Sequence, residues 1–154
     1  MDFEIEIEAM LDLRIGQTGH SFFSARMRPE LAVGCTQRGA AYADRGTGTI
    51  VDSEGNRDES GTFGKDSSWC AYYGKQADAI EGLALMQHPQ NTLSGRWFTR
   101  NYGFMSPSPF AHDGAVEMSA GTKFNFAYRV VVFEGDHEQA DIEGWYEDFA
   151  GESN

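Results

Sequence analysis

The sequence predicts a mainly β fold, an antiparallel β-sandwich that carries one amphipathic α-helix near its C-terminal end. Three observations predict this fold. The first residues alternate strictly between apolar and acidic side chains, as in a strand with one solvated face. Short apolar segments then follow one another, punctuated by 18 glycines and 4 prolines. Only one segment has the period of a helix, so strands and helices do not alternate as they do in an α/β protein.

The first predicted strand begins at Phe3. Its apolar residues Phe3, Ile5 and Ile7 face one side, and a row of glutamates faces the other. Because strand side chains alternate between faces, one face is predicted to be buried and the other solvated. The acidic row also discourages pairing with a second copy of the same edge.

The later strands are predicted from short apolar or alternating runs. The longest, Thr122–Phe133, begins in alternation and ends apolar on both faces, which is typical of a central strand or of one covered by another element at its far end. Residues 52–68 are predicted to form a long polar loop, because Gly, Ser and acidic residues dominate them. The remaining predicted strands are His20–Arg28, Ala32–Val33, Ala40–Ala43, Thr47–Val51, Trp69–Tyr73, Ile80–His88, Trp97–Arg100 and Ala115–Met118.

The predicted helix covers residues 137–150. Asp136 is the predicted N-cap, and Gln139 stands three residues later as in a capping box. Gly151 follows as a stop signal. One apolar stripe at the spacing i, i+3, i+4 and i+7 gives the helix a buried face. The stripe consists of Ile142, Trp145, Tyr146 and Phe149.

Composition limits the class of protein. The chain of 154 residues fits a single domain spanning 1–154, and 40% apolar residues are enough for a core. A net charge of −12 argues against binding nucleic acid or anionic lipid. No apolar run approaches the roughly 18 residues of a membrane span, and no secretory signal is present, so we expect a cytoplasmic protein. The acidic, lysine-poor composition is compatible with a salt-loving host and equally with an ordinary acidic protein.

No motif for a metal or a cofactor is recognisable, so we expect neither. The acidic residues that begin at Asp52 do not fit a calcium loop, because Arg57 and Phe63 stand where that loop needs Gly and Glu. Cys35 and Cys70 are predicted to be free thiols, since two cysteines at this spacing form neither a disulfide framework nor a metal motif.

The candidate site lies in the segment 81–110, where polar and aromatic side chains gather around turns. Such a mixture suits a sugar-type ligand, because rings stack on C–H faces and fixed polar groups bond hydroxyls. Arg100 and Tyr102, on one face of a short strand, are the best candidates, and a buried structural salt bridge of Arg100 is the competing interpretation. The predicted ligand-binding residues are Arg100, Tyr102, Asn91, Trp97 and Asn101.

If the protein is an enzyme, His88 is the candidate for proton transfer, because imidazole titrates near neutral pH. Glu81 is its candidate partner, although strand parity puts the two side chains on opposite faces. The alternative is that His88, just before Pro89, ends a strand and bonds a backbone group. Whether the protein is an enzyme stays open.

Four blocks of the sequence, in this order, resemble the family labelled "methane oxygenase PmoA", a domain of unknown function. The blocks are FGKDSSWCAYYG, IEGLALMQHPQN, WFTRNYGFMSPSPF and YRVVVFEGD. The resemblance implies a galactose mutarotase-like sandwich, of which this chain is similar to the C-terminal part. This chain departs from the family's pattern at two places. Members of the family tend to carry an Asp at the position of Gln87, and they tend to carry a His-Pro pair where this chain has Leu93, Ser94 and Gly95. Methane oxidation is not expected, because membrane methane oxygenases need transmembrane helices.

Two functions follow as expectations. The first is a carbohydrate-binding or carbohydrate-processing protein with a saccharide ligand. The second is a structural or interaction subunit whose product is a homo-oligomer. A half-length sandwich leaves strand edges uncovered, so the simplest assembly is a two-fold dimer.

Overall fold

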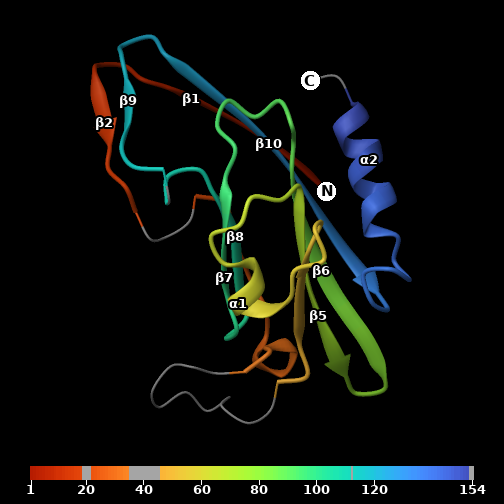
Figure 1. The fold of residues 1–154 in the computed structure, drawn as a ribbon. Helices are drawn as coiled ribbons and strands as arrows, with labels where there is room; N and C mark the ends of the chain where they lie inside the picture. The colour runs from red at the N-terminus through yellow and green to blue at the C-terminus, as the bar shows by residue number, and fades with distance from the viewer. Residues whose placement is uncertain (19–21, 35–45, 112, 153–154) are drawn as a thin grey trace.

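The computed structural model describes residues 1–18, 22–34, 46–111 and 113–152. Within these residues the fold is mainly β, with antiparallel pairing between strands and a helix at the C-terminal end, as the sequence predicts (Figure 1). The predicted strand Ala40–Ala43 and the Cys35 thiol lie outside the described residues. No helix in the described part of the chain is both long and apolar enough to span a bilayer.

A five-stranded antiparallel sheet forms the centre of the molecule. Its register places Phe3 opposite Tyr128 and Tyr72 opposite Leu83, so alternate side chains of neighbouring strands share a face. The first strand of the chain therefore pairs with the last. The strand order is β1 (Asp2–Glu8), β10 (Lys123–Glu134), β6 (Ala79–Gln87), β5 (Trp69–Gln76) and β4 (Thr49–Asp52).

A smaller three-stranded sheet packs on one face of the central sheet. It consists of β3 (Ala25–Arg26), β8 (Phe104–Ser108) and β7 (Arg96–Arg100). A two-stranded ribbon of β2 (Leu13–Ile15) and β9 (Val116–Met118) continues the molecule beyond it (Figure 1). Buried side chains from both sheets form the sandwich core: Ile50, Cys70, Tyr72, Leu85, Trp97 and Met105.

Helix α2 (Ile142–Gly151) covers the other face of the central sheet. It begins five residues later than predicted, because Asp136 caps a separate turn. The Asp136 carboxylate accepts from the Gln139 N–H at 2.8 Å, and the Gln139 side chain accepts from the Asp136 N–H. The capping box is therefore present. Asp141, however, has a left-handed backbone conformation with a φ of 50°, which interrupts the helix, and its side chain accepts from the Gly144 N–H as the N-cap of α2.

The polar loop at 52–68 contains a short helix that the sequence did not predict. Helix α1 (Asp58–Thr62) has Asp58 and Glu59 in its first turn, where carboxylates favour the helix dipole. A second difference lies at 29–33, where a 3₁₀ turn, η1 (Pro29–Leu31), is followed by irregular chain, so the predicted strand Ala32–Val33 does not form. The predicted strand His20–Arg28 is strand only at Ala25–Arg26 among its described residues.

One buried arginine joins the two ends of the described chain. Arg129, on β10, donates to both carboxylate oxygens of Asp2 at 2.6 and 2.9 Å. The same guanidinium donates to Glu152, just beyond α2, at 2.8 Å, and it lies 4.9 Å from the ring centre of Phe149. Strand β1, strand β10 and helix α2 are thereby held by one side chain.

Candidate functional site

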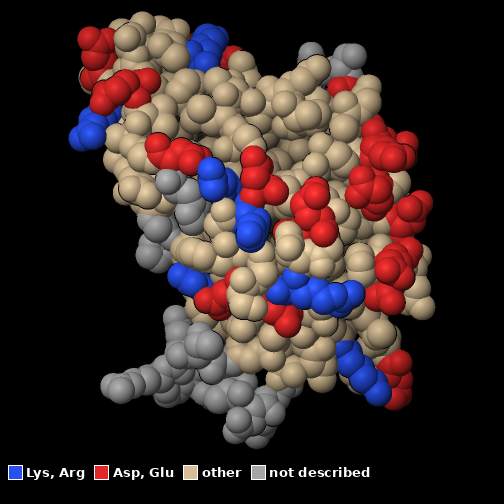
Figure 2. Space-filling view, in the orientation of Figure 1, with Lys and Arg blue, Asp and Glu red and all other residues tan. Residues whose placement is uncertain are grey.

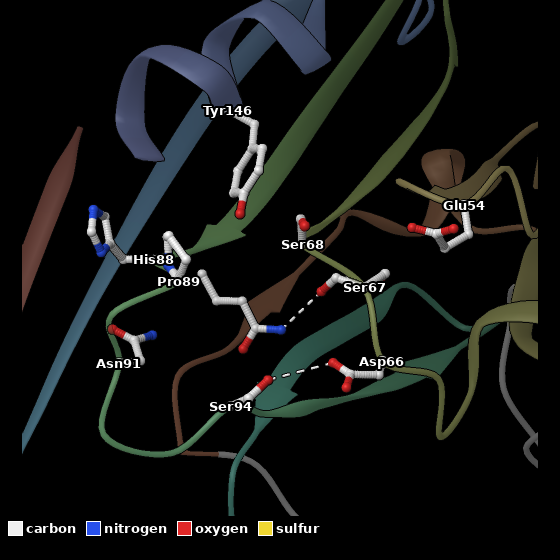
Figure 3. Close-up of a pocket in the computed structure, with 10 residues that line it drawn as sticks. Glu54, Asp66, Ser67, Ser68, His88, Pro89, Asn91, Ser94 and Tyr146 are labelled. Carbon is white, nitrogen blue, oxygen red and sulfur yellow. Dashed lines mark hydrogen bonds between the residues drawn. The ribbon is translucent and has the colours of Figure 1, made fainter. Parts of the chain in front are cut away.

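A polar pocket of about 300 Å³ lies where β6 ends, beside α2 and the two loops that flank it (Figure 3). Two carboxylates, two carboxamides, three serines and one tyrosine line it, and its lining contains neither Lys nor Arg. It therefore offers hydrogen-bond acceptors and donors but no cation for an anionic group. The lining residues are Glu54, Asp66, Ser67, Ser68, Gln87, His88, Pro89, Asn91, Ser94 and Tyr146.

Gln87, the last residue of β6, fixes the pocket's shape. Its buried amide nitrogen donates to the carbonyls of Ser67 at 2.8 Å and Gly95 at 2.9 Å. Its side-chain oxygen accepts from the Gly95 N–H at 2.9 Å. Both loops of the pocket are therefore tied to the end of one strand. An ionised aspartate at this position has no N–H to donate to the Ser67 and Gly95 carbonyls. The amide of Gln87 is therefore suited to holding the two loops together.

Asn91 lines the pocket, and its carboxamide also holds the loop in place. It donates to the Ala127 carbonyl at 3.2 Å and accepts from the Ala127 N–H at 2.6 Å. The next residue continues this pairing, because the Thr92 N–H donates to the Asn125 carbonyl. The loop after β6 thus takes the place of a strand beside this half of β10, and it carries Asn91 and Ser94 to the pocket.

His88 is buried at the rim, and its ring points toward the end of α2 (Figure 3). Its Nδ1 accepts from the Gln90 N–H, and its Nε2 lies 3.2 Å from the Glu152 carbonyl oxygen. This pattern fits a neutral ring that carries its proton on Nε2. The ring also packs edge-on against Phe149 at 5.0 Å. These contacts favour the packing interpretation of His88.

The polar groups that remain for a ligand come from other residues. Tyr146 reaches from α2 with its hydroxyl toward the pocket, opposite the loop that carries Ser68 (Figure 3). Neither of these two hydroxyls bonds another described residue. Asp66 accepts from the Ser94 hydroxyl at 3.4 Å, and Glu54 accepts from Ser53 at 3.4 Å, both long distances for such bonds.

The structure does not bring Glu81 near His88. Glu81 lies at the opposite end of β6, opposite Gly74 on one neighbouring strand and Glu134 on the other. At about 3.3 Å per residue, some 20 Å of strand separate it from the pocket. Trp97 is fully buried in the sandwich core, and its indole N–H donates to the Ser67 carbonyl at 2.8 Å. It supports the wall of the pocket from behind.

Arg100 and Asn101 lie on the outer side of the three-stranded sheet, where they anchor α1. The Arg100 guanidinium donates to Glu59 at 2.6 Å and lies 4.5 and 4.6 Å from the ring centres of Phe63 and Phe98. The other oxygen of Glu59 accepts from the Asn101 N–H at 2.9 Å, and the Asn101 side chain accepts from the Glu59 N–H at 3.0 Å.

Tyr102 lies on the same outer side, with the guanidinium of Arg26 4.8 Å from the centre of its ring. Arg100, Asn101 and Tyr102 therefore form a cluster apart from the pocket, and Arg100 has the carboxylate partner that the structural interpretation requires.

Sulfur and metal chemistry find no support among the described residues. Burial between the two sheets raises the pKa of the Cys70 thiol well above its ordinary value, which keeps the thiol protonated and unreactive. No group of three His, Cys, Asp or Glu side chains in the described part of the chain is arranged to hold a metal ion.

Sequence reasoning placed His88 and Asn91 at the pocket but missed its carboxylates and hydroxyls. Asp66, Ser67 and Ser68 directly precede β5, and a polar run at the end of a buried strand is a signal that points to such a site. Tyr146 was assigned to the apolar stripe of the helix, since periodicity alone does not show that its hydroxyl reaches a pocket.

A family model matches residues 1–147, and its description is a family of unknown function (DUF6807). The chain belongs to this family. The DUF6807 match includes every strand of both sheets and most of α2, so it covers all the residues that line the pocket. A search of curated proteins found no match, and a search of solved structures found none.

Proposed function

We propose that this protein binds a small neutral, hydroxyl-rich ligand, such as one saccharide unit, in the pocket between β6 and α2. The observation that carries the proposal is the lining itself. Carboxylates, carboxamides and hydroxyls surround the pocket, one tyrosine ring stands over it, and no cationic side chain lines it. Sugar hydroxyls both donate and accept, so they match such a lining, whereas a phosphate or a sugar acid would be repelled by Glu54 and Asp66.

Size and shape favour a single ring. A volume of about 300 Å³ is at the lower end of small-molecule pockets, which span roughly 300 to 1,000 Å³. Tyr146 packs its ring against the core and brings its hydroxyl to the pocket, where this hydroxyl can bond a sugar hydroxyl. The sequence resemblance to the family labelled "methane oxygenase PmoA" implies a galactose mutarotase-like sandwich, and this analogy of fold is in keeping with the same ligand class.

Binding is proposed here rather than catalysis. Both nitrogens of His88 have partners within the protein, and Glu81 lies at the far end of β6. The acid and base that sugar epimerisation needs are therefore not assembled from this pair.

The test is a calorimetric titration of the protein with a panel of neutral mono- and disaccharides. We expect saturable binding of at least one sugar. Tyr146→Phe removes only the hydroxyl and should weaken that binding about tenfold, which corresponds to one net hydrogen bond. Tyr102→Phe removes a hydroxyl from the outer cluster and should leave binding unchanged.

Two results would overturn this assignment. One is the absence of binding across the panel. The other is a loss of binding in Tyr102→Phe or Arg100→Ala with none in Tyr146→Phe, which would move the site to the outer side of the three-stranded sheet.

A further inference from the structure

Helix α2 forms one wall of the pocket, and the turn before β5 forms the wall opposite. Tyr146 brings its hydroxyl from α2, while Ser67 and Ser68 line the other wall (Figure 3). The width of the pocket therefore depends on how α2 is placed against β5. Trp69, the first residue of β5, directly follows the serine wall in the chain, so its side chain can link the position of that wall to the helix.

The serine wall is held in place by hydrogen bonds to other parts of the molecule. The Ser67 carbonyl accepts from the side chain of Gln87 and from the indole of Trp97, both at 2.8 Å. The Ser68 N–H donates to the Ser53 hydroxyl at 3.1 Å, and the Ser68 carbonyl accepts from the Gln87 N–H. None of these partners belongs to α2, so the wall keeps its position without the helix.

One hydrogen bond joins the strand of this wall to the helix. The indole N–H of Trp69 donates to the carboxylate of Glu143, in the first turn of α2, at 2.7 Å. Such a short distance is typical of a bond to an ionised acceptor. Trp69 is only 4% exposed, and an indole N–H can only donate, so Glu143 satisfies a donor that burial would otherwise leave without a partner.

The other carboxylates of α2 face solvent. Figure 2 shows Asp and Glu side chains gathered along the side of the molecule that α2 forms. Glu147 and Asp148 are exposed, and neither forms a hydrogen bond or an ion pair with another described residue. Glu143 is also exposed, but its carboxylate reaches back to the sheet. It is therefore distinguished from its neighbours by the bond to Trp69.

Tyr146 lies three residues after Glu143, on the neighbouring turn of the same side of the helix. Its ring packs against the core cluster that contains Trp69. Apolar packing is non-directional, whereas a hydrogen bond fixes a distance and an angle. A second polar contact, between the Tyr73 hydroxyl and Nδ1 of His137 at 3.2 Å, holds the turn before α2 rather than the helix itself. The bond from Trp69 to Glu143 therefore fixes this part of α2 relative to the serine wall.

We propose that Glu143 is a positioning residue of the pocket. By accepting from Trp69, it holds α2 where the Tyr146 hydroxyl faces the serine wall at a separation suited to a single sugar ring. Glu143 does not line the pocket, so it acts through Tyr146 and not on the ligand. This inference rests on the proposed function, because it concerns the same pocket and the same hydroxyl.

The first test is a calorimetric titration with a neutral sugar that the native protein binds. Glu143→Ala should weaken binding by about fivefold to tenfold, which is at most the loss caused by Tyr146→Phe. The variant that carries both changes should bind no more weakly than Tyr146→Phe alone, because no hydroxyl is left to position. If Glu143 acted independently of Tyr146, the two losses would multiply.

Two matched variants separate the hydrogen bond from the charge and from the helix. Glu143→Gln removes the charge but keeps a side-chain oxygen that accepts from the Trp69 indole, so its affinity should stay within about twofold of the native value. Glu147→Ala removes an exposed carboxylate of the same helix and should leave binding unchanged.

A measurement without ligand keeps this proposal separate from the proposed function. In NMR spectra of the ligand-free protein, Glu143→Ala should shift the indole N–H signal of Trp69 and the ring signals of Tyr146. Glu143→Gln should leave both near their native positions. Glu147→Ala, which is closer to Tyr146 in the chain, should leave the indole signal in place and controls for effects of sequence neighbourhood on the ring.

Three results would overturn the proposal. They are native indole and Tyr146 signals in folded Glu143→Ala, losses of affinity that multiply when Glu143→Ala and Tyr146→Phe are combined, and a Glu143→Gln variant that binds as weakly as Glu143→Ala. If no sugar binds to the native protein, the proposed function fails. The spectra without ligand then still decide whether Glu143 positions Tyr146.

Discussion

At the scale of single residues, the ion cluster around Arg129 differs from the surface ion pairs. Arg129 is 8% exposed, and two carboxylates and the Phe149 ring hold its guanidinium. Arg14 and Glu117, in contrast, form an ion pair in which both side chains are mostly exposed. Burial strengthens each interaction with Arg129 because solvent screens it less.

We therefore predict that Arg129→Ala lowers the free energy of unfolding by about 2 kcal/mol. This is below the 3–5 kcal/mol typical of a broken buried pair, since the released carboxylates are half exposed and regain water. Arg14→Ala, the matched control, should cost less than about 0.5 kcal/mol. Urea denaturation at pH 7 measures both, and equal losses would contradict the argument.

The same cluster predicts a dependence on pH. The hydrogen bonds from Arg129 lower the pKa of Asp2 below its ordinary value, and the Met1 ammonium acts in the same direction. A carboxyl whose pKa is lower in the folded state contributes stability above its unfolded pKa, about 3.9, and loses it as pH falls through the folded value. The contribution is small because Asp2 is half exposed.

Asp2→Asn should accordingly be less stable than the native protein at pH 7, and the difference should shrink as the pH falls through the lowered pKa of Asp2. Thermal unfolding of both proteins between pH 2 and 7 measures this. A difference that grows as the pH falls would contradict the assignment.

At the scale of elements, the loop after β6 depends on the strand that precedes it. Gln87 donates two hydrogen bonds, one to the Ser67 carbonyl and one to the Gly95 carbonyl. A carboxylate in place of this buried amide would put a negative oxygen against the same carbonyl oxygens, so two hydrogen bonds are replaced by repulsion. Gln87→Glu should destabilise the protein by about 3 kcal/mol and abolish binding in the pocket. Gln90→Glu makes the same change of charge at an exposed position three residues away and should have little effect. Denaturation curves for the two variants decide this prediction.

Elements with a strong local pattern were predictable from the sequence. The alternation of β1 and the positions of Ile142 and Phe149 in α2 reflect burial of one face, whereas Trp145, which the sequence places on the same buried stripe, is 49% exposed. The sequence does not predict β8, because Pro107 lies within it. The structure tolerates this proline because β3 pairs with β8 only at Phe104 and Met105, before Pro107 is reached. Helix α1 was missed because its stability comes from a distant partner, the pairing of Glu59 with Arg100.

The site was less predictable than the fold for a related reason. His88 and Asn91 were found because they follow a strand in a polar loop. The pocket, however, forms only where loops at 54 and 66–68 meet α2, and these segments are far apart in the chain. Sequence spacing carries no record of such a meeting. The period of the helix predicts correctly that Tyr146 packs against the core, but it does not predict that the hydroxyl of Tyr146 reaches the pocket.

At the scale of the whole molecule, net charge dominates the response to salt. The chain has a net charge of −12, so its carboxylates repel one another within the folded protein. Salt screens this repulsion, because the Debye length falls from about 10 Å at 0.1 M salt to about 3 Å at 1 M. We predict that the melting temperature rises by several degrees between 0.05 and 1 M sodium chloride. Thermal unfolding followed by circular dichroism measures it, and a falling melting temperature would show that the few ion pairs outweigh the repulsion.

Arg129 also couples the opening of β1 to the opening of the last turn of α2, because it bonds a carboxylate of each segment. Terminal segments normally open independently and exchange their amide hydrogens fast. Here, when β1 separates from β10, Asp2 leaves the Arg129 guanidinium. One of the two carboxylates that orient this guanidinium is then lost, which weakens the hold of Arg129 on Glu152 at the end of α2. We expect amides of β1 and of the last turn of α2 to exchange with one common opening free energy, so that either end reports on the other.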